Sequence, residues 1–131
     1  MPRFLLLFLF LPLTLNAEEV LTPEQFESYS SGKTLYFAEA GQPYGAEQYL
    51  PNRQSIWQYA DGSCAKGIWY AENDLICFVY DDDSGEHCWN FLKKPENRYA
   101  ARAIGREPGA DLEVIWKDQQ PVICTGPEVG T

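Results

Sequence analysis

The stretch Asp74–Phe91, DLICFVYDDDSGEHCWNF, contains two short apolar runs separated by an acidic turn. Both runs are rich in aromatic and β-branched residues, and such runs on either side of turn residues predict a β-hairpin. Centring the hairpin on the acidic turn places Cys77 opposite Cys88. The neighbouring opposed pair is then Ile76 and Trp89. Because side chains alternate between the faces of a strand, these two pairs lie on opposite faces of the hairpin.

The same pattern recurs along the chain at intervals of about ten residues. It predicts strands at 34–39, 44–50, 54–60, 66–71, 74–80, 86–92, 97–104 and 111–117, with a short final segment at 121–124. Before them, the sequence Thr22-Pro23-Glu24-Gln25 predicts a helix over 23–30. Thr22 and Gln25 form a capping box there, and proline suits the first helical position.

Antiparallel pairing of neighbouring strands extends the hairpin in both directions. The predicted opposed pairs are Trp57 with Gly67, Trp69 with Ile76, Trp89 with Ala101, Phe91 with Tyr99, Ala101 with Val114, and Tyr99 with Trp116. All these hairpins send their aromatic side chains to a single face. A meander of about eight strands with such a face has to curl. We therefore expect a mainly β, antiparallel up-and-down barrel or sandwich, with the short helix closing one end.

Residues 1–17 have the layout of a cleavable secretory signal. Arg3 supplies a positive start, an apolar run follows, and Ala17 is a small residue in front of acidic ones. The apolar run is about half of the ~20 residues that a membrane anchor needs. We expect cleavage after Ala17, no membrane insertion afterwards, and a single domain over 18–131 that is periplasmic or secreted.

The expected mature chain is strongly acidic. Without Arg3, nine Lys and Arg remain against nineteen Asp and Glu, which gives a net charge of about −10. The absence of a basic stripe argues against binding to nucleic acid or to an anionic membrane. An acidic surface can attract a cationic partner or metal ions, although its commoner role is to keep a small exported protein in solution.

The four cysteines all lie in the expected mature part. An even number of cysteines in an oxidising compartment predicts two disulfides. The opposed pair Cys77 and Cys88 forms one of them on the outer face, which leaves Cys64 for Cys124. No cysteines have the spacing of a zinc knuckle, and the single histidine, His87, adjoins Cys88. We therefore expect no metal and no cofactor.

Five short motifs lie between Gly32 and Phe91, in about the first two-thirds of the expected domain. They are Gly32-Lys33-Thr34, Tyr44–Leu50, Gly67–Tyr70, Asp74–Tyr80 and Cys88–Phe91. Together they resemble a family of small secreted proteins from alphaproteobacteria that is classed as a domain of unknown function. The resemblance implies a bacterial periplasmic setting and a lipocalin-like β fold. It brings no known activity and no site residues.

The inward-facing aromatic stripe is the first candidate ligand-binding site. Its members are Trp57, Trp69, Trp89, Phe91, Tyr99 and Trp116. Such rings can line a cavity for a flat or apolar ligand or a saccharide, or they can fill the core of a small domain. A closed eight-stranded barrel permits both, and the filled core is favoured.

Glu47 is the candidate polar anchor for such a ligand. A carboxyl group that points into the aromatic interior has a raised pKa and can hold a ligand. The register of this hairpin depends on whether the turn is Pro51-Asn52 or Asn52-Arg53, and the face of Glu47 depends on that register, so Glu47 points either into the interior or to water. The arrangement in which Glu47 faces water is favoured.

The acidic turn Asp81–Glu86 and the neighbouring His87 are the remaining candidates. Clustered carboxylates can hold calcium, but the spacing is not that of an EF-hand and aspartate is common in hairpin turns. A solvated turn is favoured. The hairpin register aims His87 inward near Phe78, where a structural role is favoured over that of a general base, because no nucleophile is placed beside it.

These observations favour a non-catalytic periplasmic binding or interaction protein of unknown specificity. Its partner is expected to be a small apolar or aromatic ligand or an envelope protein. The contact surface is either the barrel mouth or an outer patch of Ile68, Tyr70 and Val79. One alternative is an inhibitor or stability factor for another envelope protein. Another is a small envelope hydrolase that uses carboxylates or His87.

Overall fold

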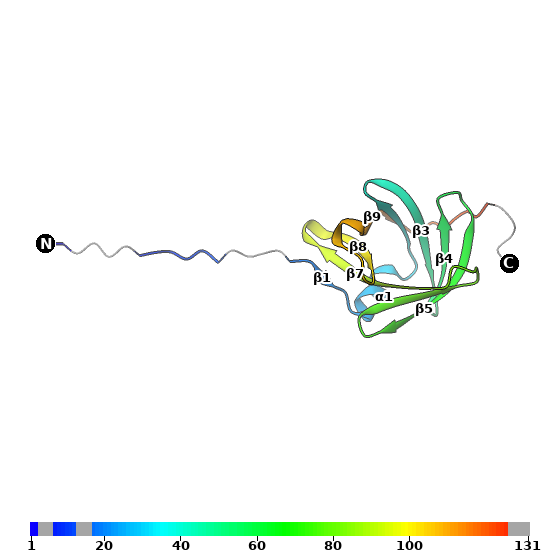
Figure 1. Cartoon of the computed structure of the whole chain (residues 1–131), viewed down its shortest axis with the longest axis horizontal. Coiled ribbons are helices and arrows are strands. Elements are labelled where there is room, and N and C mark those ends of the chain that lie inside the picture. Colours follow the sequence, from blue (N-terminus) through cyan, green and yellow to red (C-terminus); the bar gives the residue numbers. More distant parts are fainter. Residues whose placement is uncertain (3–6, 13–16, 126–131) are drawn as a thin grey trace.

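The predicted strands form a closed antiparallel barrel in a computed structural model, which describes residues 1–2, 7–12 and 17–125 (Figure 1). Its strands are β2 (Thr34–Glu39), β3 (Gln42–Leu50), β4 (Gln54–Tyr59), β5 (Cys64–Glu72), β6 (Leu75–Tyr80), β7 (Glu86–Lys94), β8 (Arg98–Ala103) and β9 (Leu112–Asp118). Each pairs with the next along the chain, and β9 returns to pair with β2. Short 3-10 turns, η1 (Pro95–Asn97) and η2 (Pro108–Ala110), flank β8. The prediction of a small mainly β barrel with one helix is confirmed.

Part of the predicted signal, at residues 3–6 and 13–16, lies outside the described residues. None of the helices in the part of the chain that the structure describes is long and apolar enough to cross a membrane.

Helix α1 (Pro23–Ser30) closes one end of the barrel. It begins as the sequence predicts. The Thr22 hydroxyl accepts from the Gln25 backbone amide, and the Gln25 side-chain oxygen accepts from the Thr22 backbone amide. Phe26 is fully buried and packs 5.2 Å from Trp69 and 4.2 Å from Phe91, between ring centroids. The aromatic core at this end is therefore filled by the helix.

Two segments outside the barrel differ from the prediction. A short strand that the sequence did not indicate, β1 (Glu19–Val20), pairs with the C-terminal half of β7. The predicted segment 121–124 is not a strand. It crosses the outside of the barrel instead, held by side-chain bonds such as that from the Gln58 amide to the Ile123 carbonyl at 2.6 Å.

The hairpin β6–β7 has the predicted register, with Cys77 opposite Cys88 and Ile76 opposite Trp89. The other predicted registers are wrong by two residues, because each turn is centred one residue away from its predicted place. The observed pairs are Trp57 with Ala65, Trp69 with Phe78, Trp89 with Ala103, Phe91 with Ala101, and Ala101 with Leu112. A shift of two residues leaves every side chain on its predicted face.

Strand β9 is the exception, because a bulge interrupts its pairing with β2. Val114 pairs with Phe37 and Trp116 pairs with Tyr36, so that Ile115 is the extra residue. The bulge turns Trp116 outward, where 63% of its surface is exposed. The prediction that Trp116 faces the interior is therefore wrong.

Both predicted disulfides are present. Cys77–Cys88 joins β6 to β7, and Cys77 is fully buried although it lies on the outer face. Cys64–Cys124 joins the start of β5 to the C-terminal segment, 60 residues later.

Candidate functional site

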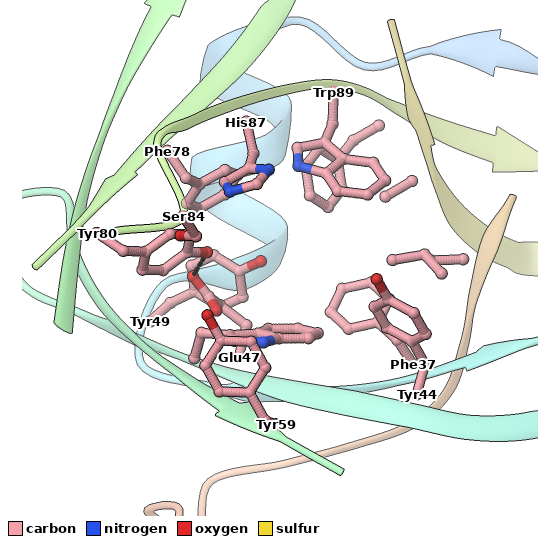
Figure 2. Close-up of a pocket in the computed structure, with 14 residues that line it drawn as sticks. Phe37, Tyr44, Glu47, Tyr49, Tyr59, Phe78, Tyr80, Ser84, His87 and Trp89 are labelled. Atoms are coloured by element: carbon pink, nitrogen blue, oxygen red, sulfur yellow. Dashed lines mark hydrogen bonds between the residues drawn. The ribbon is translucent and has the colours of Figure 1, made fainter. Parts of the chain in front are cut away.

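A pocket of about 150 Å³ opens at the end of the barrel opposite helix α1 (Figure 2). Most of its wall is aromatic, and its rings include those of Phe37, Tyr44, Trp57, Tyr59, Trp89 and Phe91. The polar groups at the pocket are Glu47, Ser84, His87 and tyrosine hydroxyls. The favoured prediction of a filled interior is thus correct for the helix end and wrong for this end, where no helix enters.

Trp57 is the centre of the aromatic wall. Its ring centroid lies 6.1 Å from Phe37, 5.9 Å from Tyr44 and 6.1 Å from Tyr59. The indole lies against the backbone of Gly45 on the neighbouring strand, where an added Cβ would overlap the ring. The glycine that makes room for Trp57 is therefore Gly45, whereas the predicted register placed Gly67 opposite this ring.

Gly67, the glycine that the sequence assigned to Trp57, makes room for another ring of the pocket. It pairs with Tyr80 on β6, and an added Cβ would lie 2.7 Å from Cδ1 of that ring. The side chain of Tyr80 can therefore lie across β5 and point its hydroxyl into the barrel.

Glu47 lies inside the barrel, with only 2% of its surface exposed. The loop between β3 and β4 has three residues, Pro51 to Arg53, rather than either of the two predicted turns. This register places Glu47 directly opposite Trp57. The favoured prediction that Glu47 faces water is wrong, and the loop length is the reason.

Within the described residues, the carboxyl group of Glu47 accepts one hydrogen bond of standard geometry. Tyr80 donates its hydroxyl to Oε1 at 2.8 Å. Among the described residues, neither Oε2 of Glu47 nor the hydroxyl of Ser55 has a hydrogen bond of standard geometry, although both are buried. The Ser55 hydroxyl lies close enough to the carboxyl group to lower its pKa without forming such a bond. A buried polar atom without a partner is rare in proteins and calls for an explanation, of which a bound ligand or water is one.

Burial has the largest effect on the pKa of Glu47. Loss of solvent raises its pKa from 4.5 to about 8, although the hydroxyls of Ser55 and Tyr80 oppose this shift. Burial also raises the pKa of Tyr80 and of Tyr49. At neutral pH the empty pocket therefore contains a mostly neutral carboxylic acid beside neutral phenols.

The mouth of the pocket carries an ionised carboxylate. Asp82 accepts from the hydroxyl of Tyr59 at 2.5 Å and from the backbone amide and hydroxyl of Ser84. The hydroxyls of Ser84 and Tyr59 hold the pKa of Asp82 below its usual range. The turn 81–86 is exposed, as predicted, and its bond to Tyr59 fixes it against the pocket wall.

His87 lies opposite Phe78 and lines the pocket, as the register predicted. The structure also brings Ser84 to the pocket, which the sequence did not indicate. The Ser84 hydroxyl donates to Asp82, and no hydrogen bond joins Ser84 to His87 within the described part of the chain. Ser84 and His87 are therefore not arranged as a nucleophile and its general base in this geometry.

Four of the predicted ligand-binding residues line the pocket: Glu47, Trp57, Trp89 and Phe91. Trp69 and Tyr99 do not, because they belong to the filled end. Trp69 packs on Phe26, and Tyr99 stacks on Tyr29 of the helix with centroids 4.0 Å apart. Trp116 lies outside the barrel.

Sequence reasoning missed four pocket tyrosines: Tyr44, Tyr49, Tyr59 and Tyr80. The inward alternation through Ile76 and Phe78 continues to Tyr80, so the pattern contained the signal for this residue. Tyr59 follows Trp57 by two residues on the same strand, so the same alternation predicts that it faces inward.

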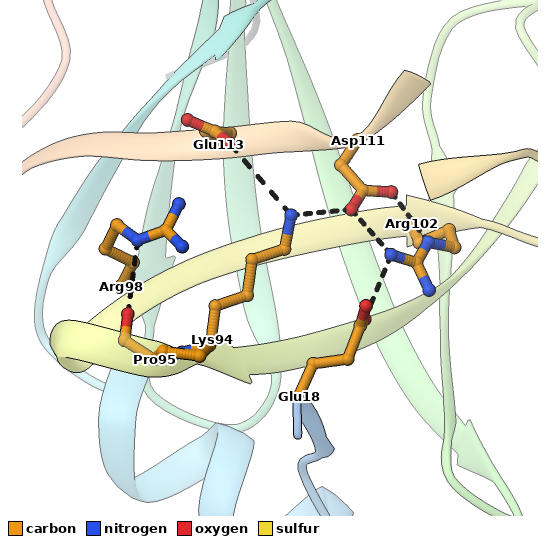
Figure 3. Close-up of polar contacts among 7 residues, drawn as sticks. All are labelled: Glu18, Lys94, Pro95, Arg98, Arg102, Asp111 and Glu113. Atoms are coloured by element: carbon orange, nitrogen blue, oxygen red, sulfur yellow. Dashed lines mark hydrogen bonds and ion pairs between the residues drawn. The ribbon is translucent and has the colours of Figure 1, made fainter. Parts of the chain in front are cut away.

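A separate buried ion cluster joins β7, β8 and the loop before β9 (Figure 3). Asp111 has 2% of its side chain exposed; it receives two bonds from Arg102 at 2.7 Å, and the ammonium of Lys94 lies 2.8 Å away. Burial acts to raise the pKa of Asp111, but bonds from Arg102 and Lys94 outweigh it and hold the pKa below its usual value. Glu18 also contacts Arg102, at 2.9 Å, and ties the start of the domain to the barrel.

The outer patch beside the Cys77–Cys88 disulfide is exposed, as predicted. Ile68 is 58% exposed, and the paired Val79 is 39% exposed. Tyr70 donates its hydroxyl to Glu86 at 2.6 Å.

The fold and the site define a class: a closed eight-stranded antiparallel barrel, sealed by a helix at one end and hollow at the other. Comparison with known protein families, with curated proteins and with solved structures found no match.

Proposed function

We propose that this protein is a non-catalytic binding protein that holds a small, largely apolar ligand in the barrel pocket, with Glu47 as its polar anchor. The observation that carries the proposal is the buried, unpartnered Oε2 of Glu47 at an aromatic cavity. Ligand sites are typically concave, mostly apolar and supplied with few polar groups, and this pocket has that composition.

The size of the pocket sets the size of the ligand. A cavity of about 150 Å³ lined by apolar side chains accommodates a molecule the size of benzene. A single ring with one polar substituent fits these dimensions, and larger ligands would extend through the open mouth.

The proposed location is the periplasm or another oxidising compartment outside the cytoplasm, reached through the signal at residues 1–17. Two disulfides support this location, because such bonds persist in oxidising compartments. The family resemblance to small secreted alphaproteobacterial proteins and the acidic charge agree with this setting.

A direct test uses the full chain, exported with its own leader and purified in oxidised form. Benzyl alcohol, a single ring with one hydroxyl, is titrated while the indole N–H signals are followed by NMR. The expected result is saturable shifts of the Trp57 and Trp89 signals, with no shift for the exposed Trp116. Shifts confined to Trp116, or no shifts at all, would overturn the proposal.

A further inference from the structure

On the basis of this proposed function, we infer that the pocket selects small organic cations, in which an ammonium group pairs with Glu47 and an apolar body contacts the aromatic wall. Three independent observations point to this ligand class: the free carboxyl oxygen, the aromatic surround and the charge of the mouth.

The carboxyl oxygen supplies the counter-charge. Oε2 of Glu47 is buried and has no partner within the described residues, and Tyr80 occupies the other oxygen. An ammonium group can donate directly to the free oxygen, and hydrogen bonds between ionised groups are about twice as strong as neutral ones.

The aromatic wall is the second feature that suits a cation. Electron-rich ring faces attract ammonium groups within about 6 Å of the ring centroid, most strongly at tryptophan. Trp57, Tyr44 and Tyr59 form a continuous set of such rings around the anchor. Figure 2 shows Tyr59 and Tyr80 beside Glu47, with Trp89 across the pocket.

The charge at the mouth is the third feature. The turns at this end of the barrel carry Asp61, Asp81, Asp82, Asp83 and Glu107 against a single Arg106. No lysine or arginine is among the described residues that line the pocket. The resulting negative potential attracts cations and repels anions, in agreement with the formal charge of −9 for the whole chain.

Binding of a cation has a consequence for the proton on Glu47. The titratable groups that face this carboxyl are Tyr49 on its own strand, Tyr59 on β4 and Tyr80 on β6, with His87 across the pocket. Because burial raises the pKa of Glu47 to about 8, the empty pocket holds the proton at neutral pH. An arriving ammonium ion replaces this proton, which passes to the buffer, and the carboxylate remains as the partner of the cation.

The experiment compares three ligands that share one ring: benzylamine, benzyl alcohol and benzoate. Isothermal titration of the oxidised full chain at pH 7 is expected to give a dissociation constant at least about tenfold lower for benzylamine than for benzyl alcohol, with benzoate weakest. The heat of benzylamine binding is expected to change with the ionisation enthalpy of the buffer, which reports proton release. Glu47→Gln is expected to remove the preference for benzylamine over benzyl alcohol.

The outcomes separate this inference from the proposed function. Equal binding of benzylamine and benzyl alcohol to the wild type overturns cation selection but leaves ligand binding intact, and so does a preference for benzoate. Failure of all three ligands overturns both. Because these results come from the wild type, the inference remains testable even if Glu47→Gln does not fold. Trp116→Ala, outside the barrel, is the matched control and is expected to bind all three as the wild type does.

Discussion

The hydroxyl of Tyr80 donates to the carboxyl group of Glu47 across the barrel interior, at 2.8 Å. Tyr80 lies on β6 and Glu47 on β3, and the two strands are separated in the sheet by β4 and β5. The bond therefore depends on the closed barrel rather than on pairing of neighbouring strands. It also controls the chemistry of the anchor, because it lowers the pKa of Glu47 against the effect of burial.

Removing this bond is expected to raise the pKa of Glu47 further. Tyr80→Phe keeps the ring but loses the donor that stabilises the carboxylate. The pKa is measured by NMR titration of carboxyl-labelled glutamate. Tyr70→Phe, which loses a bond to Glu86 on the outer face, serves as control and should leave Glu47 unchanged. A pKa that falls or stays constant in Tyr80→Phe would contradict the assigned role.

The stability of the fold is expected to fall as pH rises from about 5 to 8. Glu47 has a higher pKa in the folded chain, about 8, than in the unfolded chain, so the folded state binds the proton more tightly. Its contribution is complete below the unfolded pKa and is lost as pH rises toward the folded pKa, by at most about 1.4 kcal/mol per pH unit. Glu47→Gln has no titrating carboxyl group at this position, so its stability lacks this contribution to the pH dependence. Urea denaturation at several pH values should show the wild type losing stability relative to this variant, and parallel curves would disprove the shift.

The two pocket tryptophans are expected to contribute to ligand binding, whereas the exposed Trp116 is not. Trp57→Ala and Trp89→Ala should each weaken benzyl alcohol binding by about tenfold, because each removes a ring from the wall. Trp116→Ala should stay within about twofold and change the free energy of unfolding by no more than ~0.5 kcal/mol. Near-ultraviolet circular dichroism checks that the variants fold. Equal effects at Trp57 and Trp116 would argue against the pocket.

Loss of Asp111 is expected to destabilise the fold by roughly 3 kcal/mol, because Arg102 and Lys94 would be left without their shared partner in a mostly buried site. The comparison is Asp111→Asn with Glu113→Gln in chemical denaturation. Glu113 is half-exposed and lies 4.0 Å from Lys94, so its loss should change stability by no more than ~0.5 kcal/mol. Similar losses for both variants would contradict this account.

The two disulfides are expected to stabilise the fold to different extents. Constraint of the unfolded chain gives about 4 kcal/mol for the 60-residue separation of Cys64–Cys124 and about 3 kcal/mol for the 11-residue separation of Cys77–Cys88. Paired replacement of each by alanine, followed by urea denaturation, measures the two values. A larger loss from the shorter loop would show that local packing at buried Cys77 outweighs loop closure.

Much of the fold could be predicted because small errors in the position of a turn do not change the face on which a side chain lies. A turn misplaced by one residue changes the register by two and keeps each side chain on its face, so four misregistered hairpins still gave the correct inner surface. The bulge at Ile115 was enough to turn Trp116 to the other face, and no residue type there signals it.

The site was harder to predict than the fold. The face of Glu47 depends on whether the β3–β4 loop has two or three residues, a difference that the sequence does not resolve. Which rings fill the core and which line a cavity depends on how far α1 enters the barrel. Trp69 and Trp89 carry the same local pattern and lie at opposite ends for this reason.

The chain enters and leaves the barrel at opposite ends, and this determines where a tag or a surface linkage can be attached without blocking the pocket. β1 pairs beside Leu92, at the sealed end, whereas Cys124 is fastened to Cys64 close to the hollow end. An affinity tag or a sensor-chip linkage placed just before Glu18 would leave the entrance clear. The same attachment after Thr125 would lie beside the opening of the pocket and hinder the entry of a ligand.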